Sequence, residues 1–167
     1  RIDHQFKTLK TELDELKKDP NLKKHAEAIE TRAFGDGEKD KGAQARIEKA
    51  VEDGDLAAAR DAADTMAAEV DTIKMREATL PTISALQKQF TDGMYLWLTQ
   101  NQDTPSAIKA CWTRLEAQFN ADREHVLELL ASDNASQADI DTALNAMLEK
   151  IPGQASKLHA GQTAATQ

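Results

Sequence analysis

Residues 47–73 read IEKAVEDGDLAAARDAADTMAAEVDTI and hold two apolar stripes on either side of Asp53-Gly54-Asp55. Apolar residues recur every three or four positions in both stripes, which is the spacing of one face of an α-helix. They are Ile47, Ala50 and Val51 before the turn, a stripe that begins upstream at Ala43, and Leu56, Ala59, Ala63, Met66, Val70 and Ile73 after it. We expect Gly54 to adopt the left-handed conformation that ends the first helix, and Asp55 to cap the second. The stretch therefore predicts a helical hairpin.

The same spacing extends from this hairpin towards the N-terminus. Five apolar residues follow one another at intervals of three and four, and predict a helix over 2–16: Ile2, Phe6, Leu9, Leu13 and Leu16. We expect the next helix to begin at Pro20 with Asp19 as its cap, because a proline loses no hydrogen bond at the first helical position.

Towards the C-terminus, helical spacing continues over 81–98, 105–131 and 136–151. Ser136 with Asp139 three positions later approximates a capping box for the last helix. The chain is therefore predicted to be all-α, a helical bundle of about seven helices. An alternative arrangement is two consecutive three-helix units that share, or are joined by, a long helix.

The long-helix alternative depends on Leu80-Pro81. A proline inside a helix costs about 3 kcal/mol and disfavours helical angles in the residue before it. We therefore expect a new helix with Pro81 in its first turn and Thr79 as its cap. The other reading is one kinked helix that runs through the proline.

The chain is expected to form one bundle domain over 1–153, with 1–78 and 79–153 as candidate sub-units. The second half of the chain weakly resembles the first half when the sequence is shifted by about 78 residues, which would indicate an internal repeat. Chance similarity between helical patterns is the competing explanation. Residues 154–167 are small, polar and aperiodic, so we expect a polar tail or linker there. Because the chain starts with Arg1, we expect a segment of a longer protein.

Composition excludes some functions. The net charge of -8 would repel a nucleic acid, whose binding depends largely on Lys and Arg. Cys111 is the only cysteine, so an intrachain disulfide and a cysteine-rich metal site are excluded. We expect it to be a buried structural residue. The segment has no apolar run of about 18 residues, so it contains no expected membrane span. The cellular compartment stays open.

Asp122, His125 and Glu128 are the strongest metal-binding pattern in the chain, because their spacing of three places them on neighbouring turns of one helix. Helical bundles that hold two metals use such a pattern twice, with further carboxylates from other helices. No other histidine here has an acidic residue three positions earlier. We therefore expect no metal and no cofactor, and keep these three residues as weak candidates.

Tyr95, Trp97 and Trp112 are the best candidates for a protein-binding surface. They lie around the turn between two predicted helices, so antiparallel pairing would bring the two tryptophans close together. Core packing is the competing explanation, but Trp and Tyr also supply much of the binding energy at protein interfaces.

We expect a non-enzymatic interaction or structural module of a larger bacterial protein, with a protein as its partner. The first alternative is an extracytoplasmic sensor bundle that binds a small molecule between helices. A metal-dependent bundle enzyme that uses Asp122, His125 and Glu128 is the second.

Overall fold

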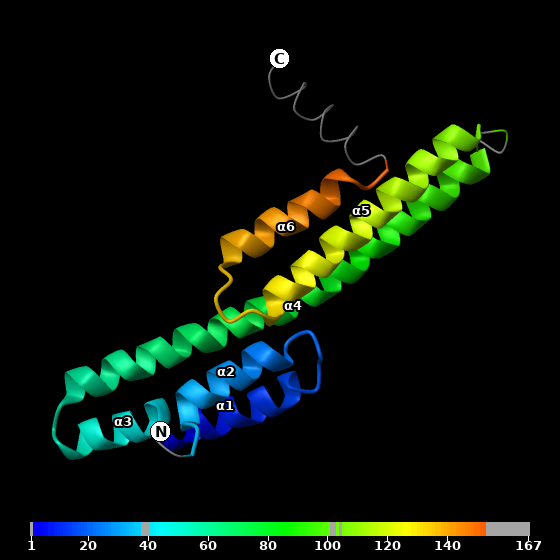
Figure 1. Cartoon of the computed structure of the whole chain (residues 1–167). Helices are drawn as coiled ribbons and strands as arrows, with labels where there is room; N and C mark the ends of the chain where they lie inside the picture. The colour runs from blue at the N-terminus through cyan, green and yellow to red at the C-terminus, as the bar shows by residue number, and fades with distance from the viewer. Residues whose placement is uncertain (1, 38–40, 101–102, 104, 153–167) are drawn as a thin grey trace. The chain divides into compact units, whose positions relative to one another are not determined.

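The computed structural model describes residues 2–37, 41–100, 103 and 105–152, and the regular elements in these residues are six α-helices (Figure 1). They are α1 (Ile2–Leu16), α2 (Lys23–Phe34), α3 (Gly42–Glu52), α4 (Leu56–Gln100), α5 (Ser106–Ala131) and α6 (Gln137–Glu149). The predicted all-α class is confirmed. The predicted tail over 154–167 lies outside the described residues.

The predicted break at Leu80-Pro81 is wrong, because α4 runs through Pro81. A buried stripe continues across the proline: Ile73, Arg76, Thr79, Ile83, Leu86 and Phe90. Thr79 is therefore a core residue and not a helix cap. Pro81 itself is exposed. Burial of this stripe offsets the cost of the proline, as packing commonly overrides local propensity.

The chain divides into two compact units. Unit 1 comprises Arg1–Ala78 and Leu130–Asn134, and unit 2 comprises Thr79–Leu129 and Ala135–Gln167. Unit 1 contains α1 to α3 and the first half of α4, together with the turn that follows α5. Unit 2 contains the second half of α4, most of α5, and α6.

In unit 1, the predicted hairpin at Asp53-Gly54-Asp55 is confirmed. Gly54 has a φ of 78°. Its N–H donates to Val51 O at 3.1 Å, and the N–H of Asp55 donates to Ala50 O at 2.8 Å. These two bonds form a Schellman motif, which satisfies carbonyls at the end of α3. The carboxylate of Asp55 then accepts from the N–H of Ala58 at 3.1 Å and caps α4, as expected.

Two other turns in unit 1 depend on Asp19 and Gly42. The predicted start of a helix at Pro20 is wrong, because Asp19 forms a turn by accepting from the N–H of Asn21, and α2 begins at Lys23. Gly42 has a φ of 83°, and a Cβ there would lie 2.4 Å from the backbone nitrogen of Gly35. Only glycine allows α3 to begin so close to the end of α2.

The core of unit 2 is built around a pair of stacked rings, Phe90 from α4 and Phe119 from α5, with centroids 4.2 Å apart. The predicted capping box is confirmed, because Ser136 and Asp139 exchange hydrogen bonds at the start of α6. Gly93 allows close packing, since a Cβ there would lie 3.2 Å from Cβ of Pro152. Across the described residues, no helix has the length and apolarity needed to cross a bilayer.

Candidate functional site

The aromatic group predicted from the sequence forms one end of a helical pair in unit 2. Figure 1 shows the second half of α4 running alongside α5. Trp97 lies seven residues after Phe90, and Trp112 lies seven residues before Phe119, so antiparallel pairing aligns both aromatic pairs. The rings of Trp97 and Trp112 have centroids 5.0 Å apart, with planes tilted by 45°. The expected approach of the two tryptophans is confirmed.

Large apolar side chains are exposed around this tryptophan pair. Tyr95 is 73% exposed, Leu96 57% and Ile108 42%. Trp97 and Trp112 are half-buried. We call this region the helical tip, defined by Tyr95, Leu96, Trp97, Ile108, Cys111 and Trp112. Its role as a binding surface remains a prediction.

Cys111 is exposed, so the expectation that it is buried is wrong. It lies at the start of α5, where all residues from 105 to 111 are exposed. Its Sγ accepts a hydrogen bond from Nη2 of Arg114 at 3.2 Å. The thiol is therefore part of the surface of the helical tip and not of the core.

The three weak candidates for metal binding on α5 do not share one environment. Asp122 forms an ion pair with Lys150, both side chains being about a quarter exposed. His125 and Glu128 are exposed. Among the residues that the structure describes, no group of three His, Cys, Asp or Glu side chains could hold a metal ion. The partner of Asp122 explains why a carboxylate interrupts the apolar stripe of α5.

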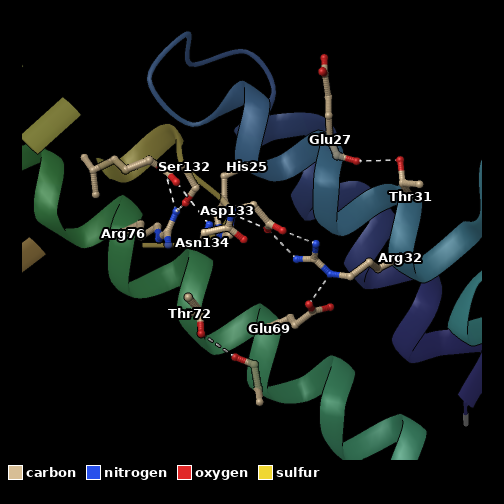
Figure 2. Close-up of polar contacts among 12 residues, drawn as sticks. His25, Glu27, Thr31, Arg32, Glu69, Thr72, Arg76, Ser132, Asp133 and Asn134 are labelled. Carbon is tan, nitrogen blue, oxygen red and sulfur yellow. Dashed lines mark hydrogen bonds and ion pairs between the residues drawn. The ribbon is translucent and has the colours of Figure 1, made fainter. Parts of the chain in front are cut away.

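Sequence reasoning missed a polar cluster in unit 1 around two buried side chains, His25 and Arg76, which we define as His25, Arg32, Glu69, Arg76 and Asp133 (Figure 2). Arg76 is only 1% exposed. Its Nη1 donates to Leu130 O at 2.9 Å and to Ser132 O at 2.5 Å. A buried guanidinium thus binds carbonyls at the C-terminal end of α5, where the helix dipole favours a positive charge.

Arg32 on α2 forms hydrogen bonds with α4 and with the turn after α5, all within unit 1. Its Nη1 and Nη2 donate to the two carboxylate oxygens of Asp133 at 2.6 and 2.7 Å. Its Nε donates to Glu69 on α4 at 2.5 Å. The hydrogen bonds from Arg32 hold the pKa of Asp133 below its usual value. This bidentate geometry fixes the turn after α5 against α2.

His25 is 3% exposed and lies in the same cluster. Its Nδ1 is 3.2 Å from Oδ1 of Asp133, but neither ring nitrogen has a hydrogen-bond partner within the described part of the chain. Burial lowers the pKa of His25 to about 4, and the charge of Arg76 adds to this effect. The imidazole is therefore neutral at neutral pH.

A groove with a volume of about 480 Å³ lies between α1 and the first half of α4 in unit 1. Its lining includes the apolar side chains Phe6, Leu9, Met66 and Val70. Carboxylates also line it, and Glu12 lies 3.5 Å from Nζ of Lys74. The lining of the groove thus combines apolar side chains with acidic ones and with Lys74.

No family model, curated protein or solved structure matches this chain.

Proposed function

We propose that this chain is a non-enzymatic interaction module and that the helical tip is its contact surface. The observation that carries the proposal is the exposure of Tyr95 and Leu96, at 73% and 57%, beside a half-buried tryptophan pair. Large side chains of this kind gain most from leaving water, and Trp and Tyr dominate binding energy at interfaces.

The surroundings of these side chains support the choice of the tip. Between Asp92 and Glu116 the sequence has only three charged residues in 23, although 30% of the whole chain is charged. The α3–α4 turn also exposes two apolar residues, Val51 and Leu56. That turn carries three acidic residues, which keep it well hydrated: Glu52, Asp53 and Asp55. The tip is thus the more favourable surface to desolvate.

The surroundings of the polar cluster support a non-enzymatic role. Arg32, Glu69 and Asp133 are engaged with one another. His25, whose pKa is lowered to about 4, is buried away from solvent, where a substrate could not reach it. The contacts and the burial of these side chains therefore favour a structural role, in which the polar cluster stabilises unit 1.

A second candidate function is the binding of a small molecule in the groove between α1 and α4. Its apolar lining and volume of about 480 Å³ favour this reading, since ligand pockets usually fall between about 300 and 1,000 Å³. Binding sites also place a few buried polar groups around the ligand. The polar residues that line this groove are not buried, which makes it the weaker candidate.

Site-specific photocrosslinking tests the proposal. A photoreactive phenylalanine analogue at Tyr95 should give a covalent adduct in cells of the source organism, and Leu96→Glu in the same chain should remove that adduct. The matched control carries the analogue at Leu56, which is 70% exposed at the other turn. Equal adducts at both positions, or none at Tyr95, would contradict the proposed contact surface.

A further inference from the structure

The exposed apolar side chains of the helical tip point in different directions. Consecutive residues of an α-helix are about 100° apart around the axis. Trp97 faces α5, where it packs on Trp112. Leu96 therefore lies to the side of the helix, and Tyr95, about 200° from Trp97, lies on the side away from α5. The end of α4 is apolar around most of its circumference.

A flat protein surface is a poor match for this arrangement. It can cover one side of a helical pair, and it would leave either Tyr95 or the opposite face in water. A medium that surrounds the tip on all sides can bury more of its apolar surface.

The stretch that contains the helical tip, residues 93–115, has a net charge opposite in sign to that of the chain. Between Asp92 and Glu116, Lys109 and Arg114 stand against Asp103, which gives a net charge of +1 in a protein of net charge -8. Lys109 and Arg114 are both exposed, on the first turns of α5. This excess of one positive charge therefore lies on the same stretch of chain as the exposed apolar side chains of the helical tip.

We infer that the helical tip inserts into the interfacial layer of an anionic lipid bilayer. Trp and Tyr are enriched at this depth because their rings are apolar and their N–H or O–H groups find polar partners. Leu96 and Ile108 would reach the acyl boundary, while Lys109 and Arg114 attract anionic headgroups. This inference rests on the proposed function, because it specifies what the same surface contacts.

The two tryptophans provide the test, since the chain has only two and both lie in the tip. Their fluorescence emission therefore reports on the tip alone. We expect a blue shift with vesicles in which about a third of the phosphatidylcholine is replaced by phosphatidylglycerol, and little shift with phosphatidylcholine alone. Lys109→Gln and Arg114→Gln should each weaken binding to the anionic vesicles by about fivefold.

Leu96→Glu should weaken the same binding at least about tenfold, because an exposed leucine that enters the bilayer is replaced by a charge. Leu56→Glu is the matched control and should bind as the parent chain does. Circular dichroism of both variants checks that they remain helical.

An unchanged emission spectrum with anionic vesicles would overturn the inference, and so would equal losses in Leu96→Glu and Leu56→Glu. If vesicles have no effect but the analogue at Tyr95 crosslinks to a protein, the lipid inference fails and the proposed contact surface stands. If neither experiment detects a contact at the tip, both fail.

Discussion

His25 lies with its Nδ1 3.2 Å from Oδ1 of Asp133, yet the imidazole is held neutral. Both oxygens of that carboxylate already accept from Arg32. The ring is buried, and the positive charge of Arg76 acts on it as well. A proton on buried His25 would therefore add a third positive charge to a polar cluster that has only two carboxylates.

This arrangement predicts that acid destabilises unit 1. Burial lowers the pKa of His25 from 6.5 to about 4 in the folded state, so the unfolded chain binds more protons between these values. The contribution of neutral His25 to the free energy of unfolding is therefore fully present above pH 6.5 and is lost as the pH falls towards 4. We expect a loss of about 2 kcal/mol in the free energy of unfolding between about pH 7.5 and pH 5, measured by urea titration.

His25→Gln is the control, because it removes the titrating group and keeps a polar side chain of similar size. The difference in stability between about pH 7.5 and pH 5 should shrink by most of the predicted 2 kcal/mol. Asp133 does not interfere, since its lowered pKa gives a contribution that is lost only as the pH falls below 3.8. An unchanged pH dependence in this variant would show that His25 is not the group responsible.

Arg76→Met tests the guanidinium that binds the end of α5. The change leaves the carbonyls of Leu130 and Ser132 without their buried donor, and each unsatisfied group costs about 1–3 kcal/mol. We expect a loss of about 3 kcal/mol in the free energy of unfolding. Arg60→Met, an exposed position on the same helix, should change it by less than about 0.5 kcal/mol. Similar losses in both variants would contradict the assigned role of Arg76.

Sequence reasoning predicted the features that depend on local interactions. The hairpin at Asp53-Gly54-Asp55 and the capping box at Ser136 need only residues that are neighbours in the chain. Pro81 was misread because its cost is local, whereas the gain that offsets it comes from burial of a stripe on both sides of it. A continuous count of that stripe from Ile73 to Phe90 would have favoured the single helix.

The two candidate sites differ in the same respect, because one is built from residues near one turn of the chain and the other from residues far apart in the sequence. The tryptophan pair was predictable because Trp97 and Trp112 flank one turn. The polar cluster was not, because Arg32 and Asp133 are 101 positions apart in the sequence. One signal was present: Arg76 occupies a position in the apolar stripe of α4, where a charged residue requires a buried partner.

Tyr95→Ala and Trp97→Ala should separate surface from core within one helix. Tyr95 is 73% exposed, so its loss should change the free energy of unfolding by less than about 0.5 kcal/mol. Trp97 is half-buried against Trp112, so its loss should cost about 1–3 kcal/mol. Urea titration followed by circular dichroism measures both. A large loss for Tyr95→Ala would mean that the tip is part of the core.

Cys111 offers a direct check on the surface of the helical tip. Because its thiol is exposed, it should react with an aromatic disulfide reagent in the native protein nearly as fast as in the urea-unfolded chain. Binding at the tip should slow this reaction, since Cys111 is adjacent to Trp112 in the sequence. Leu96→Glu, which weakens that binding, should restore the rate. A thiol that reacts only after unfolding would show that the start of α5 is covered, and the tip would then be unavailable as a contact surface.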